Sequence, residues 1–199
     1  MNRQTIFGLL FFAGIFAVSF GFFRVMTTSK NERATDLTAA LSIELKSTVS
    51  KQVQIGAWRD TYKLVYFGFT RCPSICPRTL SDVSNALKIL DEKSKLIRVL
   101  FVTVDPERDS PEVMKKYLSS FHPGIIGLTG SAASIDSMRN IFGIVAKKIP
   151  IPGKKGNYSL DHSMLLYLLT PDNRLVFAYP GGTSGDALAK ELRSELKKM

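Results

Sequence analysis

Two short apolar segments separated by a helical pattern constrain the fold more than any other feature of this 199-residue chain. Residues 64–69 read LVYFGF and residues 96–104 read LIRVLFVTV, as expected of strands buried on both faces of a sheet. Between them, residues 80–90 carry leucine and valine at helical spacing. A strand, a helix and a second strand in this order predict a β-α-β unit with parallel strands.

The later sequence repeats this alternation and then ends on a hairpin. Pro171-Asp172-Asn173 supplies turn residues between two apolar segments, which indicates antiparallel strands. The expected elements are a helix from Ser110-Pro111 to about residue 120, a strand over residues 124–130, a helix over residues 131–142 closed by Gly143, strands over residues 164–170 and 174–179, and a last helix capped by Ser184. Parallel β-α units followed by a hairpin and a closing helix describe a thioredoxin-like α/β domain.

An apolar segment near the amino terminus predicts a membrane anchor. Residues 6–23 are 18 consecutive positions without a charged side chain, and a helix of that length covers roughly 27 Å, about the thickness of a hydrocarbon core. A cleaved signal peptide is the alternative, because Arg3 supplies a positive charge and Ala17-Val18-Ser19 is an acceptable cleavage site. The apolar run continues past that site, which favours an uncleaved anchor. We therefore divide the chain into a lead (1–5), a transmembrane anchor (6–23), a linker (24–45) and one domain (46–199).

The net charge of +10 raises the question of nucleic-acid binding. The basic residues are scattered in small groups such as Lys115-Lys116 and Lys147-Lys148, and no basic stripe alternates with aromatic residues. This pattern argues against a nucleic-acid partner and indicates an ordinary solvated surface.

The two cysteines of the chain lie in the sequence CPSICP, between the first expected strand and the helix that follows it. Pro77 fits the first helical position, which places Cys76 at the N-cap and Cys72 just ahead of it. Unpaired amides and the positive end of the helix dipole stabilise a thiolate there, the form that attacks disulfides and binds metals. The location favours a reactive pair over two inert buried thiols.

Two thiolates need a third ligand to complete a trigonal metal site, and soft sulfur ligands select copper(I). His162 begins the late strand expected beside the central one, so its loop should face the cysteine loop across the end of the sheet. His122, at the end of a helix, is interpreted as an ordinary polar residue. Asp161 either orients the His162 ring or caps the strand. The wide spacing of these residues argues against a structural zinc module.

With these motifs in place, the chain resembles the SCO/SenC family of membrane-anchored copper chaperones for cytochrome c oxidase. The similar segments are VYFGFTRCPSICPRTL, FVTVDPERDSPEVMKKYL, GLTG and LDHSMLLYLLTPD, which run in family order from Leu64 to Asp172. The resemblance implies a thioredoxin-like fold in which Cys72, Cys76 and His162 bind a copper ion. It also implies delivery of copper to, or reduction of thiols at, the copper A site of cytochrome c oxidase subunit II.

The resemblance further implies a membrane-anchored protein that meets a copper donor and a thiol reductant. The short lead before the span contains no Arg- and Ser-rich presequence, which favours a bacterial inner membrane with the soluble domain in the periplasm. Two features depart from the family pattern. Ser74 stands where many members carry an acidic residue, and residues 46–62 match the opening hairpin poorly. Asp105 and Asp109, in DPERDSP, belong to the pattern and are interpreted as turn and cap residues.

Two functions are compatible with these residues, and a third fits only the fold. A metallochaperone would hold copper and pass it on by ligand exchange. An enzyme, a thiol-disulfide oxidoreductase, would use Cys72 as nucleophile and Cys76 as resolving thiol without needing His162. Both roles can coexist, because an oxidised pair cannot bind copper until it is reduced. A thiol peroxidase fits the fold but not the local sequence, because its Pro-x-x-x-Thr-x-x-Cys pattern is absent around Thr70.

Overall fold

The computed structural model describes residues 37–153 and 157–198. The expected anchor over residues 6–23 lies outside this part of the chain. Among the described residues, no helix is long and apolar enough to cross a membrane.

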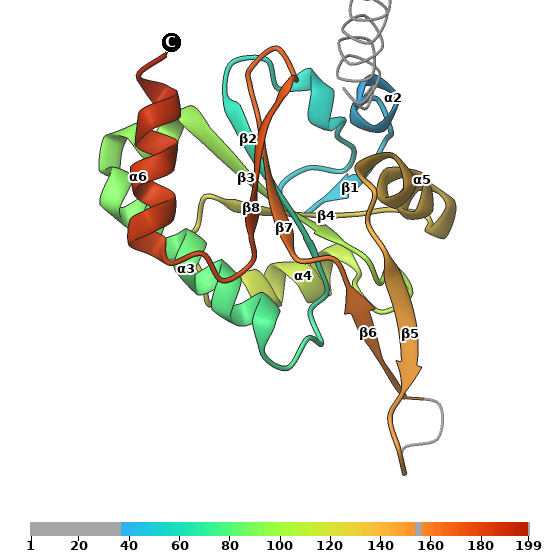
Figure 1. Ribbon diagram of the computed structural model, residues 1–199. Helices are drawn as coiled ribbons and strands as arrows, with labels where there is room; N and C mark the ends of the chain where they lie inside the picture. Colours follow the sequence, from blue (N-terminus) through green and yellow to red (C-terminus); the bar gives the residue numbers. More distant parts are fainter. Residues whose placement is uncertain (1–36, 154–156, 199) are drawn as a thin grey trace, which may run out of the picture. The chain divides into compact units, whose positions relative to one another are not determined.

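A six-stranded mixed sheet forms the centre of the fold, in the order β1-β4-β3-β2-β7-β8 (Figure 1). Strands β2, β3 and β4 are parallel, whereas β1, β7 and β8 run antiparallel to their neighbours. Every residue of β2 is buried, which explains the continuous apolar run that predicted it. The strands are β1 (Lys46–Ser47), β2 (Tyr62–Gly68), β3 (Ile97–Thr103), β4 (Ile125–Thr129), β7 (Leu165–Leu169) and β8 (Leu175–Pro180).

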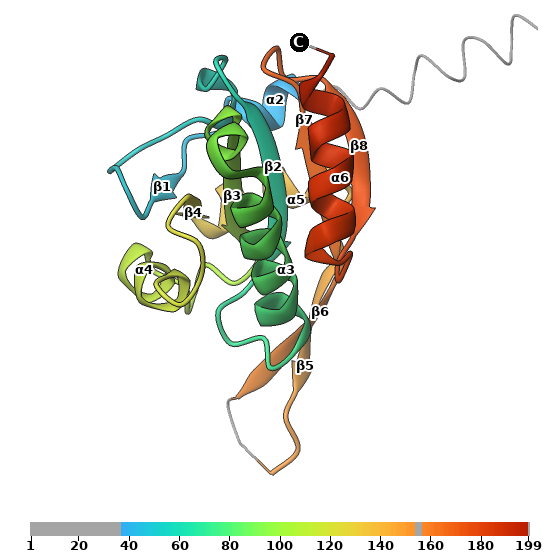
Figure 2. The ribbon, with the colours of Figure 1, turned by 90° about the vertical axis from the view of Figure 1, so that its left-hand side faces the viewer.

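Helices cover both faces of this sheet. Helices α3 (Ile75–Leu90) and α6 (Gly185–Leu196) pack side by side on one face, and α5 (Ala132–Phe142) lies on the opposite side (Figures 1 and 2). Helix α4 (Pro111–Leu118) packs against β4, and the short α2 (Thr38–Leu41) contacts α5. Two 3-10 turns, η1 (Ile55–Ala57) and η2 (Asp91–Leu96), precede β2 and β3. The predicted thioredoxin-like α/β arrangement is confirmed.

The expected helix ends are also present. The side chains of Ser110 and Ser184 accept hydrogen bonds from the backbone N–H groups of Val113 and Ala187. Gly143 ends α5 with φ 67, a left-handed conformation that glycine adopts without strain. These caps fix the lengths of the helices that the sequence pattern predicted.

The sequence did not predict a second, two-stranded antiparallel sheet, formed by β5 (Ala146–Pro150) and β6 (Tyr158–His162). This β5–β6 ribbon projects from the body of the domain (Figures 1 and 2). Most of β5 is exposed, and Lys147 and Lys148 interrupt its apolar pattern. Such a strand gives neither the alternation nor the continuous apolar run by which strands are recognised.

The core extends into the segment that we expected to be a linker. Leu37, Leu41 and Leu45 are each no more than 6% exposed and belong to the main hydrophobic cluster. Packing of these leucines ties residues ahead of β1 to the domain.

Lys63, in the middle of the sheet, is fully buried. Its Nζ donates hydrogen bonds to the carbonyl of Trp58 at 2.8 Å, the carbonyl of Pro171 at 3.0 Å and Oδ1 of Asn173 at 2.5 Å. Burial lowers the pKa of Lys63 from 10.5 to about 8. This ammonium cross-links the segment before β2 to the turn between β7 and β8.

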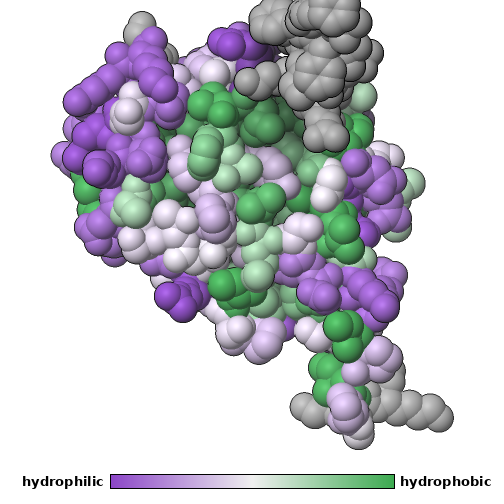
Figure 3. All heavy atoms as spheres, in the orientation of Figure 1, coloured by the Kyte–Doolittle hydropathy of each residue, from purple (hydrophilic) through white to green (hydrophobic). Residues whose placement is uncertain are grey.

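The surface is uneven in polarity. Hydrophilic residues cover the region of α6, whereas hydrophobic residues occur on the face formed by β7 and β8 and along the β5–β6 ribbon (Figure 3). Leu175 and Phe177 on β8 are 47% and 54% exposed, and Ile149 on the ribbon is 46% exposed. As an outer strand, β8 leaves one edge without a partner strand among the described residues.

Candidate metal centre

The two thiols lie in the loop that joins β2 to α3 and in the first turn of that helix. The Cys72 N–H donates to the Phe69 carbonyl at 3.3 Å, which tightens the loop, and the Cys76 N–H donates to Cys72 Sγ at 3.4 Å. Cys72 is partly exposed and Cys76 is buried. Both cysteines are free thiols in this structure. The outer thiol can therefore meet another molecule while the inner one is shielded.

The predicted position of Cys76 at the N-cap is wrong. Helix α3 begins at Ile75 with Ser74 as its N-cap, so Cys76 is the second helical residue and Pro77 the third. Proline lacks an N–H, and the N–H groups of the whole first turn have no partner within the helix, so Pro77 fits there too. Cys76 still lies at the positive end of the helix, but its interaction with Cys72 and its burial outweigh that effect and keep its thiol protonated.

Glycine makes room for the inner thiol. A Cβ on Gly68, the last residue of β2, would lie 3.0 Å from Cys76 Sγ and 2.6 Å from Cε2 of Phe101. These approaches are closer than carbon and sulfur tolerate. The glycine in FGFTRC therefore lets Cys76 pack against the end of the strand.

His162 is brought to the thiols as predicted, but by a different element. It ends β6, where it pairs with Ala146 of β5, and does not begin a strand of the main sheet. Its Nε2 lies 3.5 Å from Cys76 Sγ, and its ring packs edge-on to Phe69 with centroids 5.7 Å apart. The side chain is 8% exposed.

One sulfur from each cysteine and one ring nitrogen of His162 all lie within 4.8 Å of one another. This is the one group of three or more metal-ligating side chains in the part of the chain that the structure describes. Two thiolates and an imidazole suit a soft ion such as copper(I), and zinc also accepts them. Only modest movements would place all three donors on one ion.

The two thiols differ in acidity. The hydrogen bond from the Cys76 side chain, with a further one from His162, lowers the pKa of Cys72 from 9.0 to about 4. The same interaction, together with burial, raises the pKa of Cys76 well above its ordinary value. Cys72 is therefore a thiolate at neutral pH, as a nucleophile or metal ligand must be.

The other sequence candidates lie apart from this cluster or contact it differently. Asp161 is exposed on β6, and among the described contacts no hydrogen bond joins its carboxylate to the His162 ring. The Nδ1 of His162 lies instead 2.9 Å from the carbonyl oxygen of Ser163, which orients the ring. The expected orienting role of Asp161 is thus taken by a backbone group. His122 Nδ1 accepts from the N–H of Gly124 at 3.1 Å, away from the thiols.

Asp109, expected to be a turn or cap residue, supports the thiol loop directly. Its buried carboxylate accepts from the Thr70 N–H at 3.0 Å and from the Thr70 hydroxyl at 2.6 Å. It also accepts from the Thr103 hydroxyl at 2.7 Å. Burial raises the pKa of Asp109. The sequence motif was recognised, but its connection to the loop depends on tertiary contacts.

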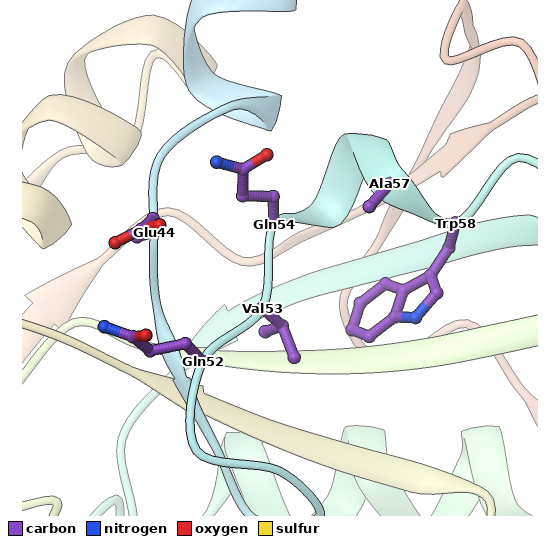
Figure 4. A pocket seen from close by; sticks show the side chains of 6 residues that line it. All are labelled: Glu44, Gln52, Val53, Gln54, Ala57 and Trp58. Carbon is purple, nitrogen blue, oxygen red and sulfur yellow. The ribbon is translucent and has the colours of Figure 1, made fainter.

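A separate pocket lies where β2 begins, whereas the thiols follow the end of that strand. Its volume is about 320 Å³, and no cysteine or histidine lines it (Figure 4). The lining residues are Glu44, Gln52, Val53, Gln54, Ala57 and Trp58. The pocket therefore does not belong to the candidate metal centre.

Comparison with protein families identifies relatives of the whole domain. The model of the family described as SCO1/SenC matches residues 34–197. A mitochondrial SCO2 homologue of Danio rerio is 37% identical over 150 residues, which are 74% of this chain and 52% of that protein. A SCO2-like protein of Rickettsia prowazekii is 40% identical over 116 residues, or 58% of this chain and 57% of that protein. The chain thus spans little more than half the length of these curated relatives.

Solved structures show the same fold. The copper-bound ScoI of Bradyrhizobium japonicum is 34% identical, with a TM-score of 0.71 over 76% of this chain and 96% of that one. Copper-bound yeast Sco1 is 31% identical, with a TM-score of 0.70 over 79% of this chain and 87% of that one.

Proposed function

The chain belongs to the SCO1/SenC family, and from this membership and the geometry of its thiol–imidazole cluster we propose that it is a copper-binding factor for cytochrome c oxidase assembly. Cys72, Cys76 and His162 hold one copper(I) ion. The observation that carries the proposal is the convergence of two sulfurs and one ring nitrogen within 4.8 Å. Relatives of known structure that are described as copper-bound support the choice of copper.

The ion is the cargo of the protein. We propose that it passes to the copper A site of cytochrome c oxidase subunit II when thiolates of that site replace Cys72, Cys76 and His162 one at a time. The partial exposure of Cys72 supports this route, because an incoming thiolate must reach the metal from the solvent side. A separate copper donor loads the site.

Thiol-disulfide exchange is the second candidate, and the unequal acidity of the two thiols favours it. The Cys72 thiolate attacks a disulfide of the receiving protein and forms a mixed disulfide, which releases one partner thiolate. Cys76, once deprotonated, then attacks Cys72 Sγ, forms the Cys72–Cys76 disulfide and releases the second partner thiolate. The partner gains two electrons, and an external thiol reductant restores the dithiol.

We place the protein at a bacterial inner membrane, held by residues 6–23, with the domain over residues 46–199 in the periplasm. Relatives include a SCO2-like protein of Rickettsia prowazekii and a mitochondrial SCO2 homologue of Danio rerio. Copper delivery outside the cytoplasm agrees with a redox-active thiol pair, because disulfides form and persist in that compartment.

Copper titration of the reduced full-length protein tests the proposal. We expect one copper(I) per chain and an X-ray absorption spectrum with two sulfur ligands and one nitrogen ligand. His162→Ala should keep the two sulfur ligands, lose the nitrogen and bind copper more weakly. If His162→Ala binds copper as tightly as the unmodified protein, the assignment of the third ligand fails.

A further inference from the structure

The residue that completes the candidate metal centre is held by an element outside the main sheet. His162 ends β6, and β6 pairs only with β5 in the described part of the chain. Cys72 and Cys76, in contrast, follow directly from the buried strand β2. The distance between histidine and thiols therefore depends on how the β5–β6 ribbon is attached to the body.

A cluster of three side chains attaches β6 to the body, and we call it the clasp: Asp105, Arg108 and Tyr158. The Tyr158 hydroxyl donates to Asp105 Oδ1 at 2.7 Å, and Arg108 Nε donates to Asp105 Oδ2 at 2.5 Å. Arg108 also donates from Nη1 to the Tyr158 carbonyl at 2.9 Å, and its guanidinium carbon lies 3.6 Å from the centre of the Tyr158 ring. Tyr158 belongs to β6, whereas Asp105 and Arg108 belong to the loop after β3.

The clasp is shielded from water, whereas the contact beside it is not. The side chains of Asp105 and Arg108 are 1% and 13% exposed, so their ion pair is little screened. Lys148 Nζ pairs with Glu107 Oε2 at 2.7 Å, but both side chains are at least half exposed. An exposed pair of this kind contributes little to stability. Arg139 of α5 donates from Nη2 to the Ala146 carbonyl at 2.9 Å and so holds β5, whereas the clasp is the buried contact that holds β6, the strand of His162.

The clasp is also connected to the loop that carries Cys72. The Asp105 N–H donates to the Thr103 hydroxyl at 2.9 Å, and that hydroxyl donates to Asp109 Oδ2 at 2.7 Å. Asp109 in turn accepts from the backbone and the side chain of Thr70, two residues before Cys72. A continuous series of hydrogen bonds thus runs from the ribbon to the thiol loop.

We propose that the clasp is a positioning device for the metal centre, in which the Tyr158 hydroxyl holds the ribbon closed so that His162 reaches the thiols. When the clasp opens, the histidine is withdrawn and two thiols remain, a state suited to releasing metal or exchanging disulfides. The inference rests on the proposed function, because it concerns the third ligand of the same site. The inference gives Asp105 and Arg108 of the DPERD turn, and Tyr158 of β6, a role beyond forming the turn and the strand.

The test replaces single atoms of the clasp. Tyr158→Phe removes only the hydroxyl, and loss of that charge-assisted hydrogen bond should weaken copper(I) binding about tenfold in competition with a chromogenic copper(I) chelator. Tyr62→Phe is the matched control, because the Tyr62 hydroxyl donates to the Glu195 carbonyl at 3.4 Å, away from the metal centre. The control should bind copper like the unmodified protein. Arg108→Lys keeps the positive charge but removes the planar guanidinium, whose N–H groups donate to Asp105 and to the Tyr158 carbonyl at once. It should weaken copper(I) binding, as Tyr158→Phe does.

A double-mutant cycle separates positioning of His162 from general destabilisation. In a His162→Ala background, Tyr158→Phe should have no further effect on copper affinity, because the group that it positions is absent. X-ray absorption of Tyr158→Phe should show a reduced nitrogen contribution with both sulfurs retained. An equal loss of affinity in the presence and absence of His162 would overturn the inference.

The two proposals fail in different ways. If the unmodified protein binds no copper, the proposed function falls and the inference falls with it. If the unmodified protein binds copper, His162→Ala binds it weakly and Tyr158→Phe binds it normally, the proposed function stands and only the inference is overturned.

Discussion

Cys76 Sγ lies 3.5 Å from Nε2 of His162, although 86 positions separate the two residues along the chain. The sulfur comes from a helix that follows the buried central strand, and the nitrogen comes from the end of a ribbon outside the main sheet. The two thiols of the candidate centre are therefore held by the packed core, whereas the position of His162 depends on a few polar contacts. The predictions below address these parts separately.

Alkylation of the reduced, metal-free protein should modify Cys72 first and at low pH. The pKa of Cys72 is lowered to about 4, so its thiolate predominates at pH 6, whereas the raised pKa of Cys76 keeps that thiol protonated. Mass spectrometry after brief treatment with iodoacetamide at pH 6 should find the label on Cys72. Preferential labelling of Cys76 would contradict this assignment. The Cys72→Ser variant should take up no label during the same brief treatment.

The stability of the reduced protein should depend on pH through the same two thiols. Between pH 4 and the pKa of an unfolded cysteine, the unfolded chain binds the Cys72 proton that the folded chain has lost, so the free energy of unfolding rises with pH. Above the unfolded pKa, Cys76 stays protonated only in the folded chain, so stability falls. Urea unfolding from pH 5 to 10 should show this maximum in a Lys63→Met background, which lacks the opposing contribution of Lys63 above pH 8, and Cys72→Ser should remove the acidic limb.

Gly68→Ala should disturb the inner thiol. The added Cβ would meet Phe101 at 2.6 Å and Cys76 Sγ at 3.0 Å, and overpacking of this kind costs about 1–3 kcal/mol. We expect a lower urea midpoint together with weaker copper binding. Gly124→Ala is the control, because its Cβ would meet only the His122 ring, at 3.1 Å. Equal effects of the two substitutions would mean that Gly68 has no special place beside the thiol.

Asp109→Asn should loosen the loop that carries Cys72. Asparagine keeps one oxygen of the carboxylate and replaces the other by an NH2 group that cannot accept, so at least one of the hydrogen bonds from Thr70 and Thr103 is lost, and leaving a buried donor without a partner costs about 1–3 kcal/mol. Urea unfolding should show this loss. Thr70→Val removes one of the donors, so the double variant should lose less than the sum of the single variants. Strict additivity would contradict a direct contact.

Lys63→Met tests the buried ammonium at the start of β2. Because the pKa of Lys63 falls to about 8 in the folded chain, the unfolded chain binds more protons at this residue between pH 8 and 10.5, so the Lys63 contribution to stability should rise across that window and offset the fall due to Cys76. The methionine variant should lack this rise. It should also be less stable at neutral pH, because the carbonyls of Trp58 and Pro171 lose a donor. A matching rise in the variant would assign the effect to another group.

The sequence predicted best the parts whose signal is local. The continuous apolar run of residues 64–69 predicted a strand buried on both faces, and β2 has that burial. Ser110-Pro111 predicted the start of a helix, and Ser110 is the N-cap of α4. The convergence of Cys72, Cys76 and His162 was predicted from the order of the elements. Cys76 was predicted at the N-cap but is the second helical residue, two positions further on, because proline fits several positions of a first helical turn.

What the sequence could not predict depends on contacts between distant residues. The β5–β6 ribbon lacks an apolar pattern because most of β5 faces solvent. The carbonyl of Ser163 orients His162 through a backbone group, which no side-chain pattern records. The clasp joins Asp105 to Tyr158 across 53 positions of sequence. Each of these features follows from tertiary packing, and each concerns how the third ligand is held.

The separate anchoring of the ribbon makes this domain a practical scaffold for protein engineering. The third donor can be exchanged, for example by His162→Met or His162→Cys, without touching the buried strand that carries the thiol loop. Such variants would vary the softness and charge of one ligand while the other two stay fixed. The order of metal preference could then be tuned on an unchanged hydrophobic core.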